Sequence, residues 1–532
     1  MALINKLSVP LSAVLYCLYS LLPLKNWLRL QNYTLEPFPN FSMYQDSTLY
    51  LGLIREVING NYLIGNPFFF ENSTDGFTYL NSSLFFIWGS VGRLLDINLV
   101  HTYLLMISIN CVILIILLNL FYSIFTRSRI TILISLFTSI FLIGPLGRPS
   151  PTQQLLPILI LAIILILNQN KNINNNLRYN TIWPKLGYLC CSLILVIGSG
   201  YYSIFLFTLV VIMSVVLKKI LYFYFFTSMM CNLAYFIWTR IKFDSSDELI
   251  AERVGLHYTR IPGALSITLP LLFILSLILI LNFIHLVNLP KDNNLQVKIK
   301  LFFSLNLALL ISLNSQIFTG IAVEMESHYK LVWYVVLGVF FCIPATFISN
   351  KLKNSKHNKY LHTVNTFMLC IIIVFLGSQF EKIQLNRSER SILINNIKDD
   401  KKIKSVLIKE DSKFADLSDE VILLTDKYLY WEPNGVFSRI NQNDIISRFS
   451  CTQTRIITYE EFLKSEIASP SRGVMNSMMK EERYRKFFNL FGINRKPTIH
   501  KSFGKNEYSH YVKKQIDCLT DNYQFRVDKV IR

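Results

Sequence analysis

Residues 99–124 read LVHTYLLMISINCVILIILLNLFYSI, a run without a lysine, an arginine or an acidic residue. A helix of about 20 apolar residues spans the hydrocarbon core of a bilayer, which is roughly 30 Å thick. Similar runs recur between residues 9 and 378, and 52% of the chain is hydrophobic. The pattern therefore predicts a mostly α-helical, polytopic membrane protein.

The apolar runs predict eleven membrane spans: 9–27, 99–124, 130–145, 153–169, 185–200, 203–217, 220–238, 263–286, 301–318, 331–349 and 363–379. We divide the stretch 185–217 at GSGYYS, because a single helix of that length is too long for an untilted span and glycine disfavours a continuous helix. From residue 380 the composition turns polar and charged. We therefore expect a membrane bundle over 1–379 and a soluble domain over 380–532.

The distribution of positive charge predicts the orientation of the spans. With the N-terminus inside, the inside loops hold fifteen lysines and arginines and one acid, Asp292. The outside loops before residue 380 hold twelve acids. This asymmetry follows the positive-inside rule, so we expect a cytoplasmic N-terminus and an extracytoplasmic C-terminal domain. We expect the first apolar run to be a retained anchor, because no small-x-small cleavage site follows it.

Two outside connections are too long to be simple turns. The first covers 28–98 and includes an apolar stretch, 79–95, that we expect to form an amphipathic helix in the membrane interface. The second long connection covers 239–262. Shorter outside turns are expected at 144–154 and 320–330. Polar residues are therefore concentrated on one side of the predicted bundle.

The soluble domain combines strand patterns with a helix pattern. Strands are predicted at SVLIKE (405–410), EVILLT (420–425) and YQFRVDKVIR (523–532), and a helix at NSMMKEERYRKFFNLFG (476–492). About 150 residues are enough for a small core, so we expect a compact α/β or α+β domain. The domain holds Cys451 and Cys518, and two cysteines permit a disulfide without establishing it.

The net charge of +19 raises the question of a polyanionic partner. The basic residues are spread through loops and tail without an interleaved aromatic platform, which argues against nucleic acid. We expect contact with the anionic lipid of a bilayer or with a phosphate-bearing substrate instead. Ionisable residues are almost absent from the predicted span interiors, and this disfavours a transporter.

The first outside loop holds an aspartate at the start of a predicted helix, in MYQDSTLYLGLIREVING (43–60). Asp46 precedes an apolar periodicity that ends at Asn59-Gly60, so one interpretation is a helix N-cap. The other is a functional carboxylate held next to the membrane surface. The two interpretations are compatible, because a cap fixes the position of a carboxylate.

Four stretches on the predicted outside together resemble the GT-C class of polytopic glycosyltransferases. They are the Asp46 helix followed by GNYLIGNPFFFENSTDG (60–76), GRPSPTQ (147–153), ERVGLHYTRIPG (252–263) and NSQIFTGIAVEMESHY (314–329). The resemblance covers about residues 1–380 and points to bacterial members of the class. It depends on the order and the common side of these motifs, since none is diagnostic alone. It implies an integral membrane protein of the bacterial plasma membrane.

The resemblance also implies a substrate class and a set of site residues. The donor is a sugar carried on polyprenyl phosphate, and the acceptor is a glycan, a lipid or a protein. In this class an acidic residue of the first loop acts as base or metal ligand, and this role carries over to Asp46. The substrate-binding candidates are Glu71, Arg148, Arg253, Arg260 and His328. Arginine suits the departing lipid phosphate, because its planar fork binds phosphate through two hydrogen bonds.

Several alternatives stay open at this point. The arginines also fit contacts with lipid headgroups, His328 fits a loop hydrogen bond, and Glu71 fits a turn cap. Asp46 lacks the adjacent acid seen in some relatives, which leaves dependence on a divalent metal, Mg²⁺ or Mn²⁺, undecided. A lipid-linked oligosaccharide polymerase or ligase has a similar architecture. A transporter or flippase and a non-catalytic scaffold are further alternatives.

Overall fold

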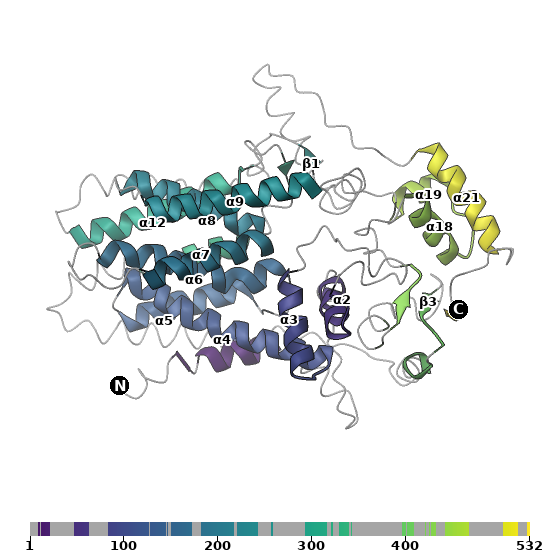
Figure 1. Cartoon of the computed structure of the whole chain (residues 1–532), viewed down its shortest axis with the longest axis horizontal. Coiled ribbons are helices and arrows are strands. Elements are labelled where there is room, and N and C mark those ends of the chain that lie inside the picture. Colours follow the sequence, from purple (N-terminus) through teal and green to yellow (C-terminus); the bar gives the residue numbers. More distant parts are fainter. Residues whose placement is uncertain are drawn as a thin grey trace, which may run out of the picture.

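The computed structural model of the chain is mostly helical (Figure 1). It describes residues 9–10, 12–21, 47–62, 83–126, 128–144, 146, 150–172, 182–217, 221–242, 257–258, 293–315, 321–322, 329–339, 342, 396–400, 402–408, 421, 425, 427–431, 442–465, 467, 504–519 and 529–531. A long bundle of helices adjoins two short helices at one end, and a small α/β domain lies beyond them (Figure 1).

The bundle consists of apolar helices joined largely by short connections. They are α4 (Leu99–Phe125), α5 (Arg129–Ile143), α6 (Pro151–Asn172), α7 (Ile182–Gly198), α8 (Gly200–Val216), α9 (Tyr222–Lys242) and α12 (Asn293–Ser312), with Ser12–Leu21 and Tyr329–Val339 as further helices. The described helices overlap all predicted spans except 263–286 and 363–379, which lie outside the described residues. The span predicted at 301–318 is displaced, because α12 begins and ends earlier in the chain.

The predicted division of the stretch 185–217 is confirmed. Helix α7 ends at Gly198 and α8 begins at Gly200. Between them Ser199 is extended, with φ −158° and ψ 94°. A Cβ atom at Gly198 would lie 2.5 Å from a methyl group of Leu155, so α6 also approaches the chain closely here. The break therefore lies where helix packing leaves no room for a larger side chain.

Two of the described helices are long and apolar enough to cross a membrane by length and composition, Leu99–Phe125 and Pro151–Asn168. Several shorter apolar helices of 10–17 residues accompany them, including α7 and α8. One or two helices that pass this test are weak support for a membrane protein, since a buried core helix passes it as well. The described helices therefore leave the predicted number of eleven spans untested.

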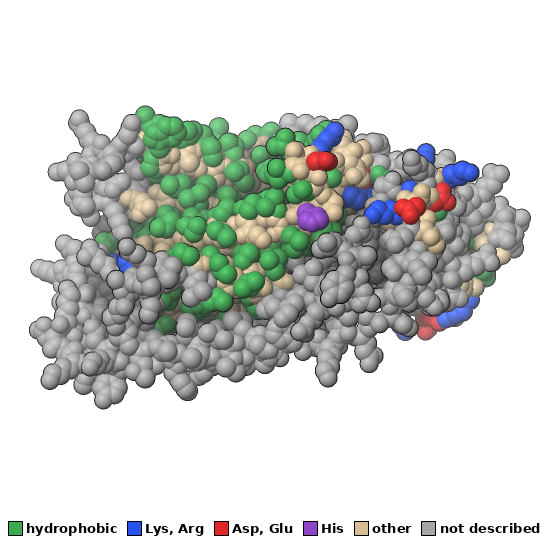
Figure 2. Space-filling model, turned by 90° about the horizontal axis from the view of Figure 1, so that it is seen from below, with side chains coloured by type: hydrophobic (Ala, Val, Ile, Leu, Met, Phe, Trp, Pro, Cys, Tyr) green, Lys and Arg blue, Asp and Glu red, His purple; other side chains and the backbone are tan. Residues whose placement is uncertain are grey.

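Helix α4 is apolar on its outer face as well as on its inner face. Its exposed side chains include Ile109, Val112, Ile113, Ile116 and Leu120, which recur at helical spacing. On the face shown in Figure 2, hydrophobic side chains cover the described part of the bundle, and most charged side chains gather near the C-terminal domain. A helix that is apolar all round is typical of a membrane span or of a deeply buried core.

Two short helices cover one end of the bundle. Helix α2 (Ser47–Ile58) confirms the helix predicted after Asp46, and α3 (Ser83–Leu94) falls within the predicted stretch 79–95. The rings of Tyr50 and Phe85 stack between them, with centroids 5.4 Å apart. The two helices pack on each other and on α4, so the described part of the stretch 28–98 is attached to the bundle.

The predicted stop after α2 is also confirmed. Gly60 has φ +97°, a left-handed conformation that glycine adopts without steric cost. The backbone N–H of Asn61 donates to the carbonyl of Glu56 at 2.9 Å, which is the 6→1 hydrogen bond of a Schellman motif. The Asn59-Gly60 pair therefore ends α2 in the way that the sequence predicts.

The C-terminal domain contains a parallel three-stranded sheet with the order β4-β3-β5. Its elements are β3 (Ser405–Ile408), β4 (Tyr428–Leu429) and β5 (Lys529–Ile531), with helices α18 (Gln442–Thr452), α19 (Tyr459–Lys464) and α21 (Lys505–Leu519). Strands β3 and β5 confirm the predictions for SVLIKE and for the end of the chain. The helix predicted at 476–492 lies outside the described residues.

The strand predicted at EVILLT (420–425) is wrong in the part that the structure describes. Val421 is helical, and the backbone N–H of Thr425 donates to the carbonyl of Val421 at 3.3 Å, which is helical spacing. The edge strand is instead β4, where the N–H of Tyr428 donates to Lys404 O at 2.9 Å. A short apolar run does not distinguish a strand from a buried helical turn.

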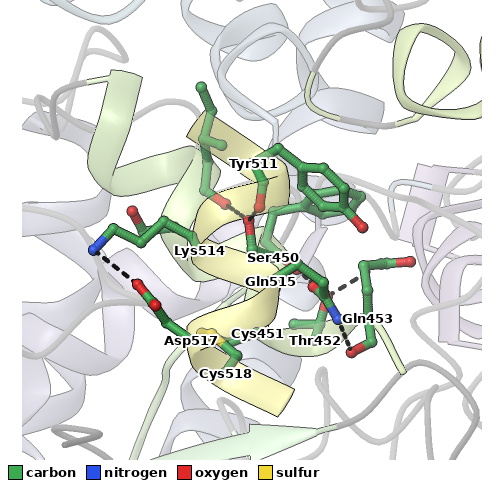
Figure 3. Close-up of a disulfide and its surroundings, with 12 residues drawn as sticks. Ser450, Cys451, Thr452, Gln453, Tyr511, Lys514, Gln515, Asp517 and Cys518 are labelled. Atoms are coloured by element: carbon green, nitrogen blue, oxygen red, sulfur yellow. Dashed lines mark hydrogen bonds and ion pairs between the residues drawn. A yellow bond between two sulfur atoms is a disulfide. The ribbon is translucent and has the colours of Figure 1, made fainter. Parts of the chain in front are cut away.

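A disulfide joins Cys451 of α18 to Cys518 of α21, with a Cα–Cα distance of 5.3 Å across 67 residues (Figure 3). Around it, Gln515 donates to the carbonyl of Gln453 at 2.8 Å, so side-chain contacts also hold the two helices together. Disulfides persist in oxidising compartments. The pairing therefore agrees with the predicted extracytoplasmic side for this domain.

We expect the double variant C451S/C518S to destabilise the C-terminal domain by about 3 kcal/mol, because the unfolded chain loses a long closed loop. Thermal unfolding of the full chain, followed through hydrogen exchange of α18 and α21, checks this. In the wild type both thiols should resist alkylation until a reductant is added. The control C190S removes an exposed free cysteine and should leave both measurements unchanged.

The N-terminus of α19 predicts a pH-dependent contribution to stability. Hydrogen bonds from the Arg455 guanidinium and from the backbone N–H of Thr458 lower the pKa of Glu461 from 4.5 to about 2. A lowered native pKa means that the ionised carboxylate stabilises the fold above pH 4.5 and that this contribution is lost as the pH falls towards 2. The melting-temperature difference between wild type and E461Q should therefore shrink over this range.

Candidate functional site

The six predicted site residues, Asp46, Glu71, Arg148, Arg253, Arg260 and His328, all lie outside the described residues. Their assignment stays a prediction. The structure does describe chain segments next to most of them. Helix α2 begins directly after Asp46, Ser150 follows Arg148 by two positions, and Tyr329 follows His328. The question is whether these neighbouring segments meet.

Two of the connections predicted to lie outside pair through their backbones. Strand β1 (His257–Tyr258) forms an antiparallel ladder with β2 (Ile321–Ala322), and His257 is opposite Ala322. Residues 257–258 lie between Arg253 and Arg260, and residues 321–322 belong to the predicted turn 320–330, which includes His328. Two loops that are far apart in sequence are thus joined near three of the predicted residues.

The N-termini of three helices also meet at this end. The Tyr202 hydroxyl near the start of α8 donates to the carbonyl of Thr152 in the first turn of α6 at 2.8 Å. The Tyr329 hydroxyl, at the start of Tyr329–Val339, donates to the carbonyl of Tyr201 at 2.9 Å. Helix N-termini carry partial positive charge and unpaired backbone donors, which suits an anion such as a phosphate.

The turn between α5 and α6 is held by the first helix of the chain. The Tyr16 hydroxyl donates to the carbonyl of Gly144 at 3.0 Å, and the backbone N–H of Leu146 donates to the Ser20 hydroxyl at 3.1 Å. This is the turn that carries the predicted Arg148. The segment Ser12–Leu21, the turn at 144–150 and the N-termini of α6 and α8 therefore form one connected group.

Uncharged polar side chains continue from this end into the bundle. The buried Asn110 of α4 donates a hydrogen bond to the buried Gln154 of α6. The hydroxyl of Ser203 on α8 donates to Asn232 on α9 at 3.0 Å. Within α4–α9, every buried polar side chain that the structure describes is uncharged. These pairs join neighbouring helices and provide no proton or ion pathway of charged groups.

A second cluster, buried and charged, lies on α2. Arg55 and Glu56 are 4% and 1% exposed and form an ion pair of 2.6 Å. Glu56 also accepts hydrogen bonds from Asn61 at 2.7 Å and from the Tyr428 hydroxyl at 3.1 Å. A carboxylate with this many donors is well satisfied, which suits a structural role better than that of a base.

The sequence reasoning missed this cluster and the Asn110–Gln154 pair. A signal for the cluster was present, since Arg55 and Glu56 interrupt an apolar helix with two adjacent charges. Such a pair on a helix next to a membrane is expected to face a polar partner. The partner, Tyr428, is more than 370 positions away in sequence, and no local pattern connects it to α2.

Metal binding at the predicted site is untested. In the ranges that the structure describes, there is no group of three histidine, cysteine, aspartate or glutamate side chains placed to hold a metal ion. Asp46, Glu71 and His328 fall outside those ranges. The divalent metal that the resemblance leaves undecided therefore stays undecided.

Comparison with known proteins yields fold similarity alone. No protein-family model matches the chain, and no curated protein matches it significantly. The structure is similar to the crystal structure of the Archaeoglobus fulgidus oligosaccharyltransferase in the apo form, with 12% identity and a TM-score of 0.40. The sequence identity and the TM-score are the same, 12% and 0.40, for the archaeal oligosaccharyltransferase AglB from Archaeoglobus fulgidus in complex with an inhibitory peptide and a dolichol-phosphate.

Each match covers 96% of this chain and 64% of the oligosaccharyltransferase chain, so this chain spans less than two thirds of those proteins.

The attachment of α2 to α3 generates a testable prediction. A Cβ atom at Gly89 of α3 would lie 2.4 Å from Cβ of Val57 and 2.9 Å from the carbonyl oxygen of Ile54, so the helices must separate. We expect G89A to lower the stability of this pair by about 1–3 kcal/mol, as overpacking does. Hydrogen exchange of α2 and α3 checks this. The control G200A adds a methyl group where no atom lies within 4 Å, and it should have no such effect.

Proposed function

We propose that the chain is a membrane-embedded glycosyltransferase that transfers a sugar from a polyprenyl-phosphate carrier to an acceptor on the extracytoplasmic side. The observation that carries this proposal is the meeting of separate outside connections at one end of the bundle. The β1–β2 ladder and the hydrogen bonds of Tyr202 and Tyr329 join segments next to Arg148, Arg253, Arg260 and His328. A shared site needs its groups within direct or water-bridged reach.

The membrane setting is supported by the surface of the bundle. The exposed side chains of α4, α7 and α9 are largely apolar, for example Ile116, Ile197 and Met230. A soluble protein rarely exposes large contiguous apolar patches, whereas lipid tails cover such a surface without cost. Arg129 and Lys185 lie at the starts of α5 and α7, on the side predicted to be cytoplasmic.

The proposed chemistry assigns a role to each predicted residue. The acceptor hydroxyl oxygen forms a bond to the anomeric carbon, and the bond from that carbon to the phosphate oxygen breaks. Asp46 accepts the proton of the acceptor hydroxyl or orients that hydroxyl. Arg148, Arg253 and Arg260 bind the lipid phosphate as its charge grows, and His328 stabilises or protonates it. Glu71 contributes to substrate binding in the same loop as Asp46.

A lipid-linked oligosaccharide polymerase or ligase is the second interpretation, since it shares the donor chemistry. Such enzymes place a large arginine- and histidine-bearing loop late in the chain, whereas the largest loop before residue 380 comes first here. A transporter is less supported. The buried polar side chains described within α4–α9 are all uncharged, whereas charged groups usually mark an ion pathway through a membrane. The glycosyltransferase proposal accounts for the early acidic loop and for the later arginine-bearing turns together.

We expect D46N to lower sugar transfer by about 100-fold or more, because general-base catalysis contributes 10²–10⁴-fold. The assay uses the full chain in membrane vesicles with a panel of polyprenyl-phosphate pentoses and hexoses, and it follows release of the free polyprenyl phosphate. D46N that retained full transfer would exclude Asp46 as the catalytic carboxylate.

D96N is the matched control for this prediction. Asp96 belongs to the same predicted outside loop, 28–98, is exposed and has a left-handed backbone with φ 52°. Asparagine tolerates that conformation about as well as aspartate, so the fold should be unaffected. D96N should therefore transfer sugar at the wild-type rate, and an equal loss in both variants would indicate a general effect of charge at this surface.

A further inference from the structure

The buried ion pair of α2 belongs to a contact between the first outside loop and the C-terminal domain. Glu56 accepts the hydroxyl hydrogen of Tyr428 at 3.1 Å, and the Arg55 guanidinium lies over the ring of Tyr428, 5.3 Å from its centroid. Tyr428 begins strand β4 of the C-terminal sheet. The two charges of α2 are thus both in contact with one residue of the other domain.

Arg55 also binds the backbone at the open edge of the sheet. The N–H groups of Tyr428 and Tyr430 donate to Lys404 and Val406 on the side of β3, so the carbonyl of Lys427 faces the other side. Arg55 donates to this carbonyl at 3.1 Å and to the carbonyl of Thr425 at 3.4 Å. A side chain of α2 therefore binds two backbone carbonyls in the segment that leads directly into β4.

A generic packing contact does not explain this arrangement. Burying an ion pair costs desolvation free energy, and well-packed apolar residues are often equal or better for stability. Apolar residues surround the pair on α2, where Ile54 and Val57 are fully buried. The charges add directional hydrogen bonds, which fix the rotation of α2 and its position along its axis relative to β4.

The other side of α2 is held just as closely. Val57 and the Ile54 carbonyl of α2 abut Gly89 of α3, where even a Cβ atom has no room. Helix α3 packs in turn on α4 of the bundle. Figure 1 shows α2 between α3 and the C-terminal domain. The helix that begins directly after Asp46 is thus fixed from both sides by contacts that do not tolerate a shift.

We propose that Arg55 and Glu56 are positioning residues through which the C-terminal domain fixes α2, and with it the first-loop carboxylate, for sugar transfer. This inference rests on the proposed function. In physical terms, a carboxylate at the start of a helix has a defined position only if the helix does. A displacement of about 1 Å from the productive geometry can cost roughly 100-fold in rate.

The test uses Y428F and E56Q in the full chain. Y428F removes the hydroxyl that donates to Glu56 and keeps the ring beneath Arg55, so it is the milder change. We expect the amides of α2 to exchange about tenfold faster in Y428F, the factor for one hydrogen bond to a charged group, and faster still in E56Q. Exchange in α6 and α8 should stay unchanged. This measurement needs no substrate.

Kinetics provide the second measurement. With the donor panel described above, kcat should fall by about tenfold in Y428F while the KM for the donor stays within a factor of two. The matched control E461Q breaks an exposed ion pair of the same domain, with a distance of 2.8 Å to Arg455, far from the contacts of α2. It should leave both α2 exchange and kcat at wild-type values.

Each outcome has a definite meaning. Unchanged α2 exchange in both Y428F and E56Q would overturn the proposal, as would faster α2 exchange with an unchanged kcat. Faster exchange throughout the bundle would show that the pair acts on global stability, and this result also overturns the positioning role. If the wild type transfers no sugar from any donor, the proposed function fails, whereas the exchange data still decide whether the C-terminal domain fixes α2.

Discussion

An apolar helix is stable only where both its faces avoid water, and the whole bundle depends on this constraint. Helix α4 has buried residues such as Ile107 and Leu114 on one face and exposed residues such as Ile113 and Ile116 on the other. Its backbone groups are paired within the helix, as a hydrocarbon environment requires. The outer face then needs lipid or further protein. Within α4–α9, the buried polar side chains that the structure describes are uncharged.

The predicted site residues belong to the connections between the helices. The structure describes only parts of these connections. Their relative positions still need contacts to define them, and the structure provides these through the β1–β2 ladder and the tyrosine hydroxyls of Tyr202 and Tyr329. The C-terminal domain adds a further contact, because Arg55 and Glu56 of α2 bind Lys427 and Tyr428 at the start of β4.

Much of the fold was predictable because it follows from local rules. The period of apolar residues and the glycines at Gly60 and Gly198 set where helices begin and end, and these predictions were confirmed. The strand predicted at EVILLT was wrong because a short apolar run fits a buried helical turn equally well. The six site residues stay predictions, since they lie outside the described residues. Segments next to Arg148 and His328 are joined through Tyr202 and Tyr329, and the segment between Arg253 and Arg260 pairs with residues 321–322.

The sequence by itself determined the apolar helices, their order, the break at Gly198–Gly200 and the change from apolar bundle to polar domain at residue 380. These properties depend on residues close together in the chain, so periodicity and composition reveal them. Only the tertiary structure decided that Tyr428 meets Glu56, that residues 257–258 pair with 321–322 and that Cys451 bonds to Cys518. Such contacts join segments that are distant in sequence. Many residues of the chain could form the same type of contact, and only the packing of the segments determines which of them meet.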